Sequence, residues 1–157
     1  PEVKLVIAPH VIDENHLVEI IRKLKRPYVR YTRADEKNVR KADCLIIDCF
    51  GLLSSIYRYG EIAYIGGGFG VGIHNTLEAA DYDIPVIFGS KYQKFQEAIQ
   101  LLEAKGAFSV KDYEELKTLL DRMLTDEVFL RESGMNASNY VTGNAGATDK
   151  IMSMINF

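Results

Sequence analysis

Short apolar runs alternate with amphipathic stretches along the chain, and this alternation constrains the fold more than any other feature. Apolar segments separated by helices are typical of a parallel sheet that is covered on both faces. We therefore predict an α/β fold, a Rossmann-like, doubly wound parallel sheet of about six strands. The strands are expected at residues 3–8, 27–31, 44–48, 62–65, 85–88 and 107–110.

The segments between these strands have helical spacing. After Asp13, a residue type that caps helices, apolar residues recur at positions 17, 20, 21 and 24, one face of a helix. Further helices are expected over residues 51–59 and 75–82. One more is expected between the fifth and sixth predicted strands, and others from residue 113 to Phe157. No linker or repeat interrupts the 157 residues, so we predict one domain over 1–157.

Charge and composition exclude several functions. The net charge of −3 lacks the basic character of proteins that bind nucleic acid. The sequence contains neither a signal peptide nor an apolar run of the ~20 residues that cross a bilayer. Cys44 and Cys49 lack a second Cys or His pair at metal spacing, and we predict buried thiols in a reducing, cytoplasmic setting.

A glycine-rich loop follows the fourth predicted strand. Residues 66–75 hold five of the twelve glycines and end where a helix is expected to begin. Glycine permits positive φ and close approach of a ligand, and N–H groups at a helix start favour an anion. The loop therefore predicts phosphate or sugar binding, although a connection that only needs tight turns remains an alternative.

The spacing of these glycines excludes two common nucleotide motifs. G-x-G-x-x-G occurs at no register, since Val71, Ile73 and Asn75 stand at the third-glycine positions. Gly67 and Gly72 have the spacing of a P-loop, but Ile73 stands where that motif needs lysine. NAD binding and ATP hydrolysis are therefore not expected.

Asn75 and Glu78 carry two compatible interpretations. Asn75 is a favoured N-cap, and Glu78 is spaced to reach back to the N–H of the cap residue. The carboxylate of Glu78 also offers two acceptor oxygens, which suit two vicinal ribose hydroxyls. A cap that fixes the side chain would orient it for the ligand.

Three segments together carry a family resemblance. They are Tyr64–Gly68, Gly72–Ala80, which contains His-Asn-Thr-Leu-Glu, and Ile84–Gly89. They resemble the carboxyl-terminal domain of the Kdo (3-deoxy-D-manno-octulosonic acid) transferases, which are GT-B glycosyltransferases. The resemblance extends over nearly the whole chain and is most specific over residues 64–106.

The resemblance implies one half of a GT-B fold that binds CMP-Kdo. In that family Kdo passes to a lipid A precursor in lipopolysaccharide biosynthesis, with no metal or other cofactor. The catalytic carboxylate and the acceptor site belong to an amino-terminal domain, so no catalytic residue is expected in this chain. The full protein is expected at the cytoplasmic face of the inner membrane, with that domain, CMP-Kdo and the lipid A precursor as partners.

The resemblance and the loop together give a predicted nucleotide-sugar site. Its residues lie in the loops that follow the first, third, fourth and fifth predicted strands. They are Pro9, His10, Phe50, Gly51, Leu52, Gly67, Gly68, His74, Asn75, Thr76, Leu77, Glu78 and Lys91.

Three positions depart from the family pattern. His10 and Val11 replace a segment that usually carries an arginine, Leu52 replaces an acidic residue, and Asp83 replaces a glycine. Two other functions remain open: a GT-B transferase that uses a UDP-sugar, and a non-catalytic nucleotide-sensing module. A two-domain sugar epimerase is a weaker alternative.

Overall fold

The computed structural model describes residues 3–145. The chain divides into two compact units, Pro1–Ile56 and Tyr57–Phe157. Each unit contains its own three-stranded sheet, and every strand pairing is parallel.

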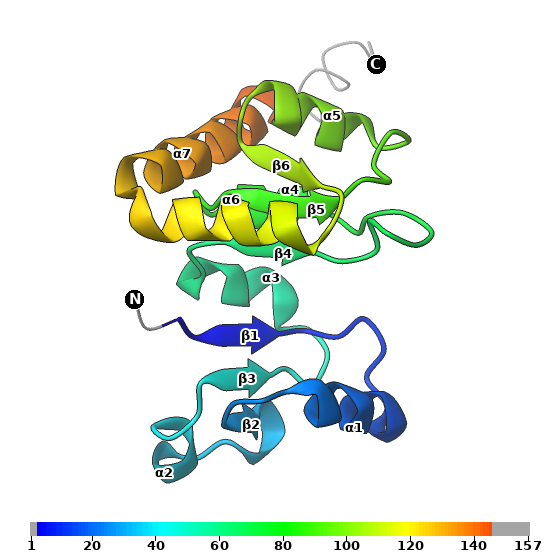
Figure 1. The fold of residues 1–157 in the computed structure, drawn as a ribbon, viewed down its shortest axis with the longest axis vertical. Helices are drawn as coiled ribbons and strands as arrows, with labels where there is room; N and C mark the ends of the chain where they lie inside the picture. Colours follow the sequence, from blue (N-terminus) through cyan, green and yellow to red (C-terminus); the bar gives the residue numbers. More distant parts are fainter. Residues whose placement is uncertain (1–2, 146–157) are drawn as a thin grey trace, which may run out of the picture. The chain divides into compact units, whose positions relative to one another are not determined.

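The first unit alternates strands with short helices (Figure 1). Its sheet has the order β1-β3-β2, so β3 is the central strand. The elements are β1 (Leu5–Ile7), α1 (Glu14–Lys23), β2 (Tyr28–Arg30), the 3₁₀ turn η1 (Tyr31–Arg33), α2 (Glu36–Val39), β3 (Cys44–Ile46) and α3 (Leu53–Ile56).

Helix α1 forms as the sequence predicts. The Asp13 side chain accepts a hydrogen bond from the His16 backbone N–H at 3.0 Å, which caps the first turn. The apolar face of α1 then packs Leu17 against Cys44 and Ile46 of the central strand. Both thiols are free: Cys44 is buried, as predicted, whereas Cys49 is only half-buried, so the prediction of a buried thiol is wrong there.

Strand β1 differs from the prediction. The sequence predicts a buried strand, but Leu5 and Val6 are 40% and 47% exposed. Neighbouring residues of a strand point to opposite faces, so β1 has an exposed side chain on each face, whereas its last residue, Ile7, packs against the cluster around Leu17. Within this unit β1 pairs with β3 alone and forms an edge of the sheet.

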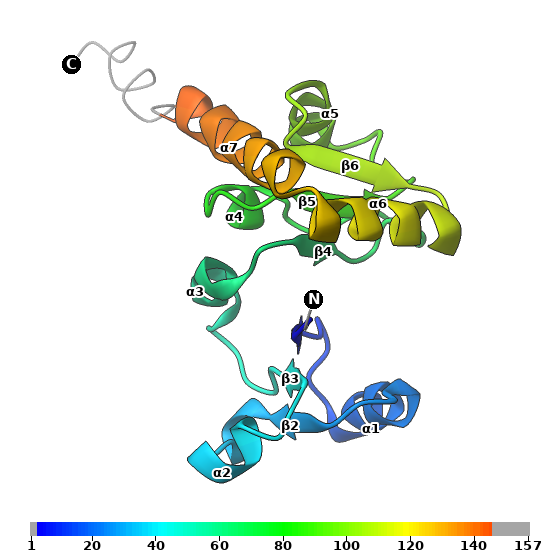
Figure 2. The same ribbon diagram turned by 60° about the vertical axis from the view of Figure 1, so that its left-hand side comes forward.

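The second unit has a sheet of order β4-β5-β6 and longer helices (Figure 2). Its strands run in the same direction, and β5 is buried along its whole length. The elements are the 3₁₀ turn η2 (Tyr57–Tyr59), β4 (Ala63–Ile65), α4 (Leu77–Ala80), β5 (Val86–Gly89), α5 (Gln96–Glu103), β6 (Ala107–Val110), α6 (Tyr113–Thr125) and α7 (Glu127–Asn144).

Helices cover both faces of this second sheet. Val86 and Phe88 of β5 join a core cluster with residues of α4, α5 and α7. Ile87, which points the other way, packs with Met123 of α6 and with Val110. The sheet of this unit is therefore doubly wound, as the sequence predicts.

The prediction of about six parallel strands between helices is confirmed, with the strands in two groups of three. The last predicted helical segment and its apolar residues Ile151, Met154, Ile155 and Phe157 lie outside the described residues. Among residues 3–145, no helix combines the length and the apolar character needed to cross a bilayer.

Among residues 3–145, two residues other than glycine have positive φ. Asp83 has a φ of 57°, which explains why a glycine is usual at this position in the family that the chain resembles. The Ser138 hydroxyl donates to the Asp83 carboxylate, so this side chain makes a contact that glycine lacks. Lys105 has a φ of 59° and follows α5, where the Gly106 N–H donates to the Leu101 carbonyl.

Lys105→Gly is expected to stabilise the chain. The left-handed conformation is strained for lysine and free of strain for glycine, but glycine gains more entropy in the unfolded chain. We expect the free energy of unfolding to rise by roughly 0.5–1 kcal/mol in urea titrations. Lys111 does not have a positive φ, so Lys111→Gly serves as the control. A loss of stability in Lys105→Gly would contradict the prediction.

Candidate functional site

The glycine-rich loop lies at the carboxyl edge of the second sheet. Strand β4 ends at Ile65 and continues directly into Gly66. A tight turn follows, in which the Gly70 N–H donates to the Gly67 carbonyl at 2.9 Å. The His74 N–H returns to the Gly66 carbonyl at 3.3 Å and closes the base of the loop. Carboxyl edges of parallel strands are where ligands bind in open α/β sheets.

Several glycines of this loop pack against other backbone. A Cβ on Gly68 would lie 2.5 Å from the Gly89 nitrogen, and one on Gly67 would lie 2.1 Å from the Gly72 carbonyl oxygen. Gly67 also has a φ of +90°. These two close contacts are made within the chain, and with the positive φ of Gly67 they explain Gly67 and Gly68 without a ligand. Gly70 has room for a methyl group, which would lie 3.7 Å from the Gly67 carbonyl oxygen.

Lys91 is joined to this loop through its backbone. Its N–H donates to the Gly68 carbonyl at 2.8 Å. Lys91 comes two residues after Gly89, whose backbone contacts Gly68. The Lys91 side chain is exposed. The loop after β4 and the loop after β5 therefore form one connected edge, with a cation beside it.

The helix start after the loop is capped in a different way from the prediction. The Asn75 Oδ1 accepts from the Leu77 N–H at 3.0 Å, and the Asn75 Nδ2 donates to the Glu78 Oε1 at 2.8 Å. Glu78 therefore bonds the side-chain amide of Asn75, and the predicted bond to the backbone N–H is wrong. Helix α4 spans only Leu77–Ala80, which is shorter than the predicted 75–82. One helical turn contributes little macrodipole, so local N–H and side-chain groups matter more here.

The remaining residues of this segment differ in accessibility. His74, Asn75 and Leu77 are exposed, and Glu78 is half-buried. Thr76 is only 1% exposed, and its hydroxyl has no hydrogen-bond partner among the described residues. Its side chain is therefore packed inside the unit and is not presented to a ligand on the surface.

Tyr57 lies near the Glu78 carboxylate. Burial, with the negative charge of Glu78 as a smaller cause, raises the pKa of the Tyr57 hydroxyl. The ring also packs against Tyr82, with centroids 6.5 Å apart. Tyr57 could not be identified from the sequence, because it lies before β4 and belongs to no motif.

The first unit contributes the other predicted residues. Pro9 and His10 follow β1, and His10 is exposed. Phe50 is 82% exposed, Gly51 has a φ of +86° and Leu52 is half-buried in the turn that follows β3. Of the predicted site residues, five therefore belong to the first unit and eight belong to the second unit.

Asp48 anchors the turn after β3. Its carboxylate accepts from the Thr32 N–H at 2.9 Å, from the Thr32 hydroxyl at 2.6 Å and from the Arg30 Nε at 2.8 Å. Arg30 also bonds Glu14, and the Asp48 side chain is 1% exposed. Burial alone would raise the pKa of Asp48, but the hydrogen bonds from Thr32 and Arg30 outweigh it and lower the pKa from 3.8 to about 2. Among residues 3–145, no group of three or more His, Cys, Asp or Glu side chains could hold a metal ion.

Gly68→Ala is expected to destabilise the chain strongly. The added methyl group would overlap the Gly89 backbone, which cannot move without displacing the end of β5. We expect a loss of about 2–4 kcal/mol in urea unfolding, or a loss of soluble expression. Gly70→Ala is the matched control in the same loop, because its methyl group would make only an ordinary contact at 3.7 Å, and it is expected to change stability by less than about 1 kcal/mol. Equal effects of the two variants would contradict the packing role.

Asp48 is expected to make stability depend on acid pH. Its pKa is lower in the folded chain than in the unfolded chain, so its stabilising effect is complete above pH ~4. That effect is lost as the pH falls from about 4 through the folded value of about 2. Urea midpoints measured at pH 7 and pH 3 should differ less in Asp48→Asn than in the wild type. An unchanged pH dependence in this variant would contradict the prediction.

Comparison with known proteins shows clear relatives. The chain is 36% identical to the 3-deoxy-D-manno-octulosonic acid transferase of Aquifex aeolicus over 124 residues, which is 78% of the chain and 34% of that protein. It is 31% identical to the transferase of the same name from Rickettsia bellii over 72% of the chain and 28% of that protein. The chain therefore spans about a third of the length of the curated relatives it matches.

A solved structure matches the fold. The C-terminal CMP-Kdo binding domain of WaaA from Acinetobacter baumannii superposes with a TM-score of 0.73 at 16% identity, covering 89% of this chain and 90% of that chain. No family model matches the sequence. By sequence and by fold, the chain is similar to the carboxyl-terminal domain of the Kdo transferases, a family of GT-B glycosyltransferases.

Proposed function

We propose that this chain is the donor-binding domain of a Kdo transferase and that it binds CMP-Kdo. The observation that carries the proposal is the 36% identity to a Kdo transferase over 78% of the chain. The connected edge formed by the loops after β4 and β5 supports it, because it gathers backbone groups, a carboxylate and a cation in one place.

Glu78 is the proposed ribose ligand. Its Oε1 is held by the Asn75 amide at 2.8 Å, whereas Oε2 has no partner among the described residues. The carboxylate is thus oriented and still has acceptor capacity for vicinal hydroxyls. A neutral amide at this position would keep the contact with Asn75 but would offer only one acceptor oxygen.

Lys91 and the glycine loop are the proposed ligands of the anionic part of the donor. The exposed Lys91 side chain starts beside the Gly68 carbonyl, to which its own N–H is bonded. An ammonium group can pair with the phosphate or the sugar carboxylate of CMP-Kdo. A methyl group on Gly70 would make only an ordinary contact, 3.7 Å from the Gly67 carbonyl oxygen, so Gly70 is the position where a ligand can approach the backbone.

The rest of the enzyme is proposed to lie outside these 157 residues. An amino-terminal domain would supply the catalytic carboxylate and would bind the lipid A precursor. The chain spans about a third of its relatives, so there is ample length for such a domain. The full protein would then work at the cytoplasmic face of the inner membrane, in lipopolysaccharide biosynthesis.

Titration of the isotope-labelled chain with CMP, UMP and AMP tests the proposal. We expect amide shifts in residues 66–78 and near Lys91, strongest with CMP, and a dissociation constant of about 1 mM, since one half of the site gives only about −4 kcal/mol. A preference for UMP would instead support a transferase that uses a UDP-sugar. Equal or absent shifts with all three nucleotides would contradict donor binding by this chain.

Glu78→Gln is expected to weaken CMP binding about tenfold, because it removes a charged acceptor of the ribose. Glu103→Gln, on the exposed side of α5, is the matched control and should bind CMP as the wild type does. Circular dichroism of both variants checks that the fold is intact. Unchanged CMP affinity in Glu78→Gln would contradict the proposed role of this carboxylate.

A further inference from the structure

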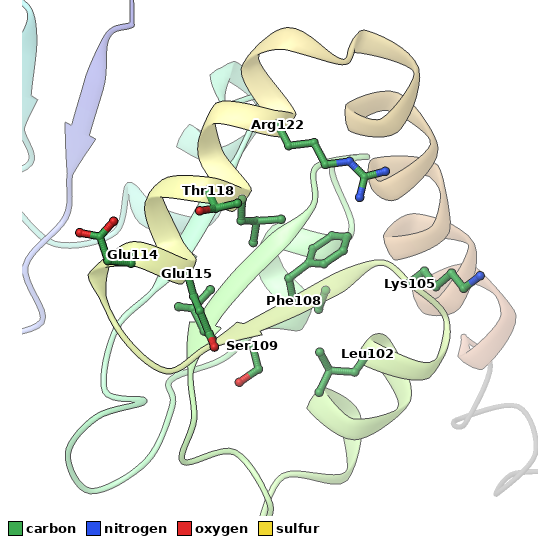
Figure 3. Close-up of a pocket in the computed structure, with 11 residues that line it drawn as sticks. Leu102, Lys105, Phe108, Ser109, Glu114, Glu115, Thr118 and Arg122 are labelled. Carbon is green, nitrogen blue, oxygen red and sulfur yellow. The ribbon is translucent and has the colours of Figure 1, made fainter.

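A groove of about 620 Å³ runs along the outer edge of the second sheet (Figure 3). Its floor is strand β6, and residues of α5 and α6 form its two walls. It shares no residue with the glycine loop. The lining includes Ala107, Phe108 and Ser109 of β6 and Glu114, Thr118 and Arg122 of α6.

The floor of the groove is a strand with one open edge. β6 pairs with β5 alone among the described strands. The Val86 N–H donates to the Gly106 carbonyl, so in this parallel register Phe108 turns its backbone groups toward β5. The N–H and C=O groups of Ala107 and Ser109 then point away from the sheet, toward the groove. An edge of this kind can accept a further strand.

One wall of the groove has a symmetric charge pattern. Glu114, Thr118 and Arg122 are spaced four residues apart on α6, and all three are exposed. They lie along one face of the helix, with Thr118 about 6 Å from each charged residue along the axis. Figure 3 shows the glutamate at one end of the groove and the arginine at the other.

Both charged groups are available for a partner. Glu115 accepts from the Lys111 N–H at 2.8 Å, but Glu114 has no partner among residues 3–145. The Arg122 guanidinium lies over the Phe129 ring at 3.6 Å from its centroid, which orients it and leaves its N–H groups without an acceptor in the described chain. Stacking on an aromatic ring does not use the in-plane hydrogen bonds of arginine.

We propose that two copies of this chain associate through this groove, with β6 antiparallel to β6 of the second copy. A two-fold axis perpendicular to the sheet would bring the two α6 helices together in opposite directions, centred on Thr118. Glu114 of each copy would then face Arg122 of the other, so the contact complements itself. The small side chain of Thr118 allows the helices to approach, and the two sheets would continue across the axis.

This dimer goes beyond donor binding and does not depend on it. Sedimentation equilibrium of the 157-residue chain over a concentration series measures the dimer directly. We expect a reversible dimer whose dissociation constant rises with salt, because the charge pairs at the rim are partly screened. A chain that stays monomeric up to millimolar concentration would overturn the proposal.

Charge reversal tests the geometry. Glu114→Arg places like charges opposite each other at both ends of the contact, as does Arg122→Glu, and each is expected to weaken the dimer at least about tenfold. An equimolar mixture of these two variants should dimerise again, because every pair across the axis is then opposite in charge. The double variant Glu114→Arg/Arg122→Glu should also dimerise.

Two further variants separate this interface from a general effect of charge or fold. Glu132→Arg makes the same charge change on the exposed surface of α7, away from the groove, and should leave the dimer unchanged. Ser109→Pro removes the central outward N–H of β6 at an edge where proline is tolerated, and should abolish the dimer. Failure of the mixed variants to associate, or dimerisation that survives both reversals, would overturn the proposed pairing.

Discussion

The close backbone contact between Gly68 and Gly89 is the constraint on which the site depends. It fixes the first turn of the glycine loop against the end of β5, the fully buried central strand of the second sheet. Lys91 then bonds the Gly68 carbonyl, so the loops after two neighbouring strands are held as one surface. A ligand at this edge meets groups whose positions are set by the core of the sheet and not by the loop alone.

Much of this arrangement could be predicted from the sequence. Apolar runs and helical spacing predicted the six parallel strands, and Asp13 predicted the start of α1. The motif around Asn75 predicted that Asn75 and Glu78 act together at a helix start, which the structure shows with a different hydrogen bond. The patterns behind these predictions are local, since each involves residues that lie close together in the sequence.

What could not be predicted depends on contacts between distant segments. β1 forms an edge of its sheet, and an apolar run does not reveal an edge position. The glycine count did not distinguish Gly68, where a Cβ would overlap the Gly89 backbone, from Gly70, where it would make only an ordinary contact. Thr76 belongs to the recognised motif but is buried, because the motif records sequence and not the direction of each side chain. Asp48 needed the positions of Arg30 and Thr32 to be understood as an anchor.

The second sheet has two different edges that serve different chemistry. Its carboxyl edge presents loops whose backbone is held by internal contacts, which suits a small anionic ligand. Its lateral edge at β6 presents strand hydrogen-bonding groups between two helices, which suits another polypeptide. The two regions share no residue, so association through the groove at β6 would leave the loops of the carboxyl edge outside the contact. A dimer formed through β6 would thus carry two copies of the proposed donor site, neither of them part of the interface.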